Sequence, residues 1–143
     1  MARLYDTDFY AWTQEQAKLL REGRLAAADV VHIAEEIEDM GRTEKRELVS
    51  RLEVLLAHLL KWRHQPDRRG KSWRLTIVEQ RRRLRRHLHD NPSLRAVLPE
   101  ALDDAYGDAR IAAARETDLE PDTFPATCPW TVDEIMDDHF WPD

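Results

Sequence analysis

The chain has little of several residue types whose abundance would define its class. A single cysteine, Cys128, stands in 143 residues, which excludes an internal disulfide framework and is typical of a reducing compartment. Only four glycines occur among many Ala, Leu, Glu and Arg residues, a composition that favours helix over sheet. Long apolar runs are missing too, and charges such as Arg3 and Asp6 interrupt the N-terminal residues, so neither a signal peptide nor a membrane span is expected. The sequence therefore predicts a soluble cytoplasmic protein.

Apolar residues at helical spacing make up much of the rest. Hydrophobic residues account for 42% of the chain and include five tryptophans, which argues against disorder, and the length suits one domain over residues 1–143. We predict an all-α, single-domain bundle of about five helices, followed by a Pro-rich C-terminal tail and a short terminal helix. The expected helices run from Asp6 or Asp8 to Gly23, from about Ala27 to Met40, from Thr43 to about Trp62, between Gly70 and Asn91, and from Ser93 or Pro99 to about Thr117.

Gly41 is the expected end of the second helix, because glycine is typical just after a last helical turn. A turn there would let the second and third helices pack as an antiparallel pair. Glu36 and His58 each lie at the edge of an apolar stripe, so this pairing would let them meet through a hydrogen bond. Such a pair is either a structural clasp or the orienting half of a catalytic site. The clasp is the preferred interpretation, because half-buried polar pairs more often form structural hydrogen bonds than take part in catalysis.

A metal site is a second interpretation of the same region. His32, Glu35 and Glu36 have the spacing of ligands on one helical face, and His58 could complete the set. A di-metal bundle would repeat Glu-x-x-His on several helices, and the chain has no second such unit. A solvated acidic face explains Glu35 more simply, so we predict no metal and no cofactor. Because no nucleophile sits in an activating context either, the sequence favours no enzymatic activity.

Basic residues gather in the middle of the chain. Residues 42–95 carry a net charge of +10, whereas the remainder carries −16. An exposed anion-binding face or internal neutralisation by the acidic flanks would each explain this division, and the acidity of the whole chain favours neutralisation. Trp62 and Trp73 fall on apolar stripes and are expected in the core, which removes a stacking platform for bases. If nucleic acid does bind, the expected residues are Arg68, Arg69, Lys71, Arg74, Arg82, Arg85 and Arg86.

The C-terminal third carries two packing signals. Small residues form the inner face of the last long helix, which would allow a close approach by a neighbouring helix or by a second copy of the chain; they are Ala101, Ala105, Ala109 and Ala112. Thr131 and Glu134 have the spacing of a capping box that opens the short terminal helix. Four aromatic residues are expected to hold the tail on the bundle: Phe124, Trp130, Phe140 and Trp141.

Several short motifs, taken in order, carry a resemblance to a known family. They are Tyr5 to Trp12, Ala34 to Gly41, Leu55 to Trp62, Ser72-Trp73, Gln80-Arg81, Pro92 to Leu94, Phe124-Pro125 and Cys128 to Thr131. Together they resemble the bacterial domain of unknown function 29 family over nearly the whole chain. The resemblance implies a helical fold and a bacterial origin, and it supplies no activity and no catalytic residue. His32 departs from the family's pattern, in which an amide residue is usual, so a role for His32 need not extend to relatives.

The functional expectation follows from these observations. We predict a protein-interaction or scaffolding module with an unknown protein partner, possible self-association through the Ala-rich helix and no membrane partner. One alternative is a nucleic-acid-binding protein that uses the basic face of residues 61–86. The other is a metal-binding protein or enzyme centred on Glu36 and His58.

Overall fold

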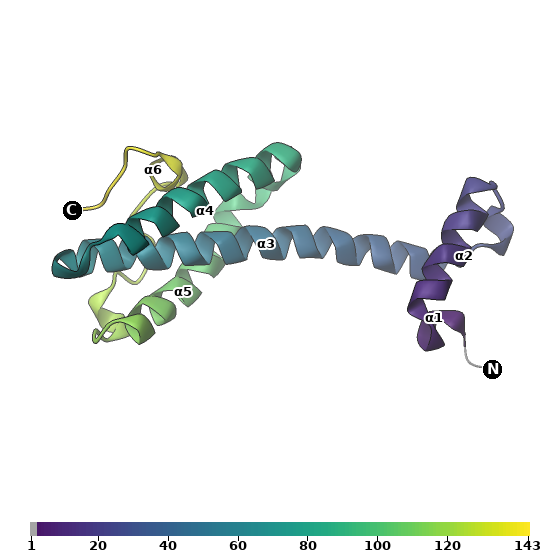
Figure 1. Cartoon of the computed structure of the whole chain (residues 1–143), viewed down its shortest axis with the longest axis horizontal. Coiled ribbons are helices and arrows are strands. Elements are labelled where there is room, and N and C mark those ends of the chain that lie inside the picture. The colour runs from purple at the N-terminus through teal and green to yellow at the C-terminus, as the bar shows by residue number, and fades with distance from the viewer. Residues whose placement is uncertain (1–2) are drawn as a thin grey trace. The chain divides into compact units, whose positions relative to one another are not determined.

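The computed structural model of the protein describes residues 3–143, all of whose regular elements are helices (Figure 1). The α-helices are α1 (Leu4–Thr7), α2 (Phe9–Arg21), α3 (Val30–His64), α4 (Lys71–Asp90), α5 (Leu98–Glu116) and α6 (Val132–Met136). Short 3-10 helices join them: η1 (Leu25–Ala27), η2 (Pro66–Arg68), η3 (Pro92–Val97) and η4 (Pro121–Thr123). The prediction of an all-α fold is confirmed.

Two compact units divide the chain, and α3 begins in the first and ends in the second. Unit 1 is the described part of Met1–Thr43 and contains α1, α2, η1 and the start of α3. Unit 2 is Glu44–Asp143 and contains the rest of α3 and all later helices. The candidate features described below each lie within one of these units.

In unit 1, α2 begins and ends at the predicted signals. The Asp8 side chain caps α2 by accepting a hydrogen bond from the Ala11 backbone N–H at 3.0 Å. Gly23 follows α2 with a φ of 70°, a left-handed conformation that costs glycine little. Few side chains in this unit are buried: Trp12, Gln16 and Leu19. The apolar core of unit 1 is therefore small.

The predicted break at Gly41 is wrong, because α3 continues through it as one helix of 35 residues. A glycine inside a helix costs only about 1 kcal/mol relative to alanine, which good helix formers on either side can offset. Thr43 does not cap a new helix. Its hydroxyl donates to the carbonyl oxygen of Asp39, one turn earlier in the same helix, at 3.0 Å.

Unit 2 holds the main hydrophobic core, which α3, α4 and α5 build together (Figure 1). The three helices contribute Leu48, Leu52, Leu55, Leu59 and Leu60 from α3, Ile77, Leu84 and Leu88 from α4, and Ala101, Ala105 and Ala109 from α5. These side chains are almost completely removed from solvent. The small residues of α5 are thus used inside unit 2, so this Ala-rich face is not available to a second copy of the chain.

The tail behaves as its sequence predicts. Thr131 and Glu134 form the capping box of α6, with each side chain bonded to the other residue's backbone N–H. Phe124 and Trp130 are buried, and Phe140 and Trp141 pack on the core. Arg81 of α4, fully buried, donates to the carbonyl oxygens of Ile135 and Phe140 at 2.7 and 2.8 Å and so ties the tail to α4. Among residues 3–143, no helix is long and apolar enough to cross a membrane.

Candidate functional site

Glu36 lies in unit 1 and takes part in a contact between α1 and α3. Its carboxylate accepts a hydrogen bond from the Tyr5 hydroxyl at 2.5 Å. This bond, together with the nearby negative charges, raises the pKa of Tyr5 to about 12, because ionising the phenol would place two anions in contact. Glu36 therefore fixes the N-terminal helix α1 on the side of α3.

His58 lies in unit 2 and has different partners. Its Nδ1 is 2.8 Å from the Val54 carbonyl oxygen, and its Nε2 is 3.5 Å from the Lys61 ammonium nitrogen. Burial, with a smaller effect of Lys61, lowers the pKa of His58 below its ordinary value. Lys61 itself is buried and pairs with Glu116 of α5 at 2.5 Å. His58 thus lies beside the ion pair of Lys61 and Glu116, which joins α3 to α5.

The structure does not bring Glu36 and His58 together. The predicted pairing needed a turn at Gly41, and the two residues instead occupy one continuous helix. His32, another ligand of the predicted metal site, also has other contacts. Its Nδ1 is 2.6 Å from the Asp29 carboxylate, and its ring stacks on Tyr5 with centroids 3.9 Å apart. These contacts give His32 and Glu36 structural partners.

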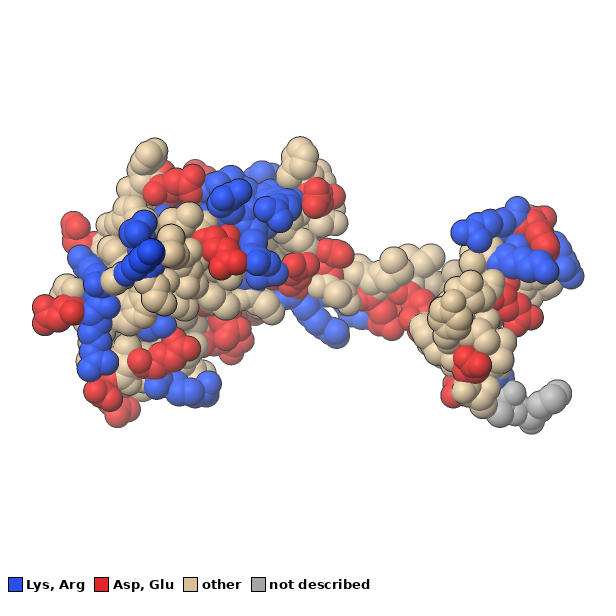
Figure 2. All heavy atoms as spheres, in the orientation of Figure 1, with Lys and Arg blue, Asp and Glu red and all other residues tan. Residues whose placement is uncertain are grey.

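The predicted nucleic-acid residues fall into two groups. Three have partners: Arg69 donates to the Trp62 carbonyl oxygen at 2.6 Å, Arg85 pairs with Asp138, and Arg68 lies 3.9 Å from Asp118. The other four are exposed on α4 and are Lys71, Arg74, Arg82 and Arg86. Figure 2 shows Lys and Arg side chains gathered over α4 with acidic side chains close by. Acidic residues thus neutralise part of the predicted basic face, as the internal-neutralisation interpretation expects.

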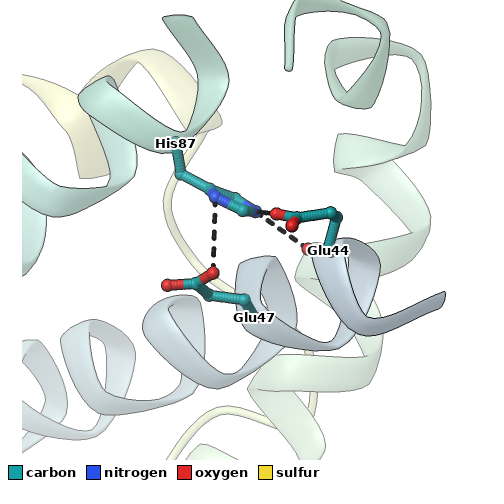
Figure 3. Close-up of side chains that lie close together, drawn as sticks. All are labelled: Glu44, Glu47 and His87. Atoms are coloured by element: carbon teal, nitrogen blue, oxygen red, sulfur yellow. Dashed lines mark hydrogen bonds and ion pairs between the residues drawn. The ribbon is translucent and has the colours of Figure 1, made fainter. Parts of the chain in front are cut away.

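A carboxylate and histidine cluster does join two helices, at other positions than predicted. His87 of α4 points toward Glu44 and Glu47 of α3 (Figure 3). Its Nε2 donates to the Glu44 backbone carbonyl oxygen at 2.8 Å and lies 3.6 Å from the Glu44 carboxylate. Its Nδ1 lies 3.6 Å from the Glu47 carboxylate. The His87 side chain is only 9% exposed, whereas the two glutamates are 46% and 43% exposed.

This cluster opens into a polar cleft of about 400 Å³ between α3 and α4. The cleft is lined by Glu44, Glu47, Arg51, Arg83, Arg86, His87, Asp90 and Asn91. Arg51 is held against Glu47, and Arg83 pairs with Glu79. A small ligand or ion in the cleft would therefore meet both acidic and basic groups.

Sequence reasoning missed this cluster. Glu44 and Glu47 have the i, i+3 spacing that places two side chains on one helical face, which is visible in the sequence but common on solvated helices. His87 lies on a different helix, and its approach depends on how α4 packs on α3. Periodicity within each helix does not supply that register.

Unit 1 carries a second unassigned feature, an exposed apolar surface. Of the thirteen large apolar residues exposed in the described part of the chain, nine lie in unit 1. Four residues at helical spacing on α3, which we call the α3 stripe, are Val30, Ile33, Ile37 and Met40. Val30, Ile37 and Met40 are 57%, 62% and 67% exposed. Tyr5 covers the side of α3 that carries His32 and Glu36, and this side borders the stripe, because Glu36 lies about 40° from Met40 around the helix.

Comparison with known proteins gives a family and nothing more specific. The family described as Domain of unknown function DUF29 matches residues 4–141, nearly the whole chain. No curated protein and no solved structure matches the chain. The resemblance expected from the sequence is therefore confirmed, and no relative supplies a substrate, a ligand or a partner.

Proposed function

We propose that this chain, which belongs to the DUF29 family of unknown function, is a protein-interaction module. Its docking surface is the α3 stripe of unit 1. The exposure of this stripe is the observation that carries the proposal. Contiguous apolar side chains on a surface typically mark a binding site, because leaving them in water forgoes about 1.5–3 kcal/mol for each side chain that could be buried.

Helical periodicity supports this assignment. Val30 and Leu48 are 18 residues apart, as are Ile37 and Leu55, and this spacing is about five full helical turns. The sequence therefore carries one apolar period along this helix, and its later members, such as Leu48 and Leu55, form the core of unit 2. Other helices of the chain cover those leucines. The earlier members, in unit 1, are exposed, as expected if a partner covers them.

The charges beside the stripe favour a partner of a particular chemistry. Residues 30–43 carry four acidic residues and one basic residue, which are Glu35, Glu36, Glu38, Asp39 and Arg42. Arg42 pairs with both Glu38 and Asp39. Its single positive charge leaves this stretch with a net negative charge, because four acidic residues lie there. Figure 2 shows acidic and uncharged side chains next to each other along this part of α3. The matching partner is an amphipathic helix of another protein, with an apolar stripe bordered by Lys and Arg.

A second copy of the chain matches this surface less well. Antiparallel pairing of two α3 stripes centred near Ile37 would place the acidic stretch of one copy beside that of the other. Like charges at such positions are destabilising and are a common means of excluding a wrong partner. We therefore assign the stripe to a different protein.

Photo-crosslinking in the source cell tests the proposal. A benzoylphenylalanine at position 34, beside the stripe, is compared with one at position 96 in η3, since Ala34 and Ala96 are both exposed. We expect crosslinks from position 34 to a Lys- and Arg-bordered amphipathic helix in another protein, identified by peptide mass spectrometry. Ile37→Glu should abolish them, whereas Ile111→Glu should not, because Ile111 is an exposed isoleucine of α5 in unit 2.

Two results would contradict this proposal. Crosslinks from position 34 to another copy of the chain would replace the partner with a homodimer. Equal crosslinking from positions 34 and 96, unaffected by Ile37→Glu, would mean that the stripe binds nothing specific. Sedimentation velocity of the purified chain gives an independent check, with a monomer expected.

The two alternatives have weaker support. Nucleic-acid binding would rely on Lys71, Arg74, Arg82 and Arg86, because the other predicted basic residues form ion pairs or hydrogen bonds within the chain. Mobility-shift assays at low and physiological salt would detect such binding by its salt dependence. An enzyme centred on Glu36 and His58 lacks support, since each of the two residues has another partner.

A further inference from the structure

We propose that His87, Glu44 and Glu47 bind one divalent transition-metal ion, and that Zn²⁺ suits their donor atoms best. One ring nitrogen of His87 and one carboxylate oxygen from each glutamate lie within 4.8 Å of one another. Two ligands on a tetrahedral zinc ion lie about 3.4 Å apart, given bond lengths of about 2.1 Å. Glu47 already faces Nδ1 of His87, and the partly exposed side chain of Glu44, whose carboxylate now lies 3.6 Å from Nε2, would have to rotate toward Nδ1 to complete the set.

His87 is held as metal-binding histidines usually are. Its Nε2–H donates to a backbone carbonyl oxygen, that of Glu44, at 2.8 Å. Such a bond fixes the tautomer and the orientation of the ring, and it leaves the other nitrogen with a free lone pair. That nitrogen, Nδ1, faces the Glu47 carboxylate at 3.6 Å, which is too long for a hydrogen bond. The lone pairs of Nδ1 and of the Glu47 oxygen therefore face each other as two ligands of one metal ion would.

Glu47 is oriented in the same way. Arg51 lies 3.4 Å from its Oε1, whereas Oε2 is the oxygen that faces His87. One oxygen is thus held by an arginine and the other remains for the ion, which is a common second contact of a ligating carboxylate.

The donor set indicates the class of ion. One imidazole with two carboxylates suits Zn²⁺ and similar transition metals, whereas Ca²⁺ and Mg²⁺ favour oxygen ligands alone. The cleft beside the cluster has room for water to complete the coordination. The charges of Arg51, Arg83 and Arg86 in the same cleft oppose cation binding, and the three acidic residues there balance them in number.

The competing explanation is an ion pair without metal. A protonated His87 would donate from both nitrogens and would join the two glutamates as an imidazolium. This arrangement would hold α3 and α4 together and would leave no lone pair for an ion. The two explanations differ in whether Zn²⁺ binds through His87, which the following experiment measures.

The test is calorimetric titration of the full chain, freed of metal by chelator and dialysis, with Zn²⁺ at pH 7.5. We expect one strong site per chain in the wild type, and about a tenfold or larger loss of affinity in His87→Gln. His32→Gln and His139→Gln are the matched controls and should retain that site, because both histidines lie outside the cluster. The ¹⁵N chemical shift of His87 Nδ1 should change on binding.

Folding of the variants is checked by circular dichroism, because His87 is buried. If His87→Gln does not fold, the double variant Glu44→Gln and Glu47→Gln replaces it, since both side chains are partly exposed. Loss of the strong site in that variant supports the proposal equally. Absence of a strong site in the wild type, or its retention in the cluster variants, would overturn the metal site and would leave the imidazolium ion pair.

Discussion

At the scale of single residues, His58 is the side chain whose protonation should affect stability most directly. Burial lowers its pKa below the ordinary value of 6.5, so the folded chain holds the ring neutral under conditions in which the unfolded chain protonates it. As pH falls below 6.5, the unfolded state takes up a proton that the folded state does not. The free energy of unfolding therefore decreases, by at most about 1.4 kcal/mol per pH unit, and by less because the ring is only half-buried.

Urea unfolding of the wild type and of His58→Gln between pH 7.5 and 5 tests this expectation. The loss of stability toward acidic pH should be smaller in the variant. It should not vanish, because burial also lowers the pKa of His64. His139→Gln, at an exposed position in the tail, is the control and should keep the wild-type slope. An identical slope in the wild type and in His58→Gln would show that His58 does not supply this proton.

Residue identity alone could not predict the partners of these ionisable groups. The sequence placed Glu36 and His58 at the edges of apolar stripes, and the structure gives each a polar contact there. The prediction was wrong about which residue each of them contacts, since Glu36 bonds to Tyr5 and His58 to the Val54 carbonyl oxygen. The same type of contact, carboxylate with histidine, forms at His87 because α4 brings that ring to Glu44 and Glu47. Which helices meet, and in which register, depends on packing across the whole unit.

At the scale of elements, Gly41 decides whether α3 is one helix or two. In a continuous helix the glycine has ordinary helical angles, and an added Cβ would meet no atom within 4 Å. Gly41→Ala should then stabilise the surrounding turns by about 0.5–1 kcal/mol, because alanine loses less backbone entropy in a helix. Native-state hydrogen exchange of the amides of residues 38–46 measures this local change.

Gly23→Ala is the matched comparison, since Gly23 also has open space around it but has a φ of 70°. Alanine is strained in that conformation, so this substitution should destabilise the end of α2. If Gly41→Ala also destabilises its neighbourhood, Gly41 occupies a left-handed conformation and ends a helix, as the sequence predicted.

Most element boundaries were predictable because their signals are local. Asp8, Gly23 and the Thr131 capping box act through hydrogen bonds or dihedral angles within a few residues of one another. Pro99 marks the start of α5 for the same reason, since its ring fits the first helical turn. Gly41 is different, because a glycine ends a helix only when the surrounding residues favour ending it. All 11 residues of α3 before Gly41 and all 23 after it are helical, so the surrounding residues do not favour an end there.

At the scale of the whole molecule, the two units differ in how much apolar surface each buries. Of 21 buried hydrophobic residues in the described part of the chain, only Trp12 and Leu19 belong to unit 1. Hydrophobic burial is the main favourable contribution to folding, so unit 1 has much less to offset its loss of chain entropy. Its polar contacts, such as that between Trp12 and Asp29 at 3.1 Å, each add only about 1 kcal/mol.

We therefore expect unit 1 to open without the unfolding of unit 2. In native-state hydrogen exchange, the amides of α2 should exchange through openings of lower free energy than those of residues 48–62, which lie in the core of unit 2. Trp12→Ala should lower protection in α2 and leave residues 48–62 unchanged, whereas Ile77→Ala should lower protection in the core of unit 2. Equal opening free energies in α2 and in the core, with both falling together in either variant, would instead mean that residues 1–143 fold as one cooperative domain, as the length predicts.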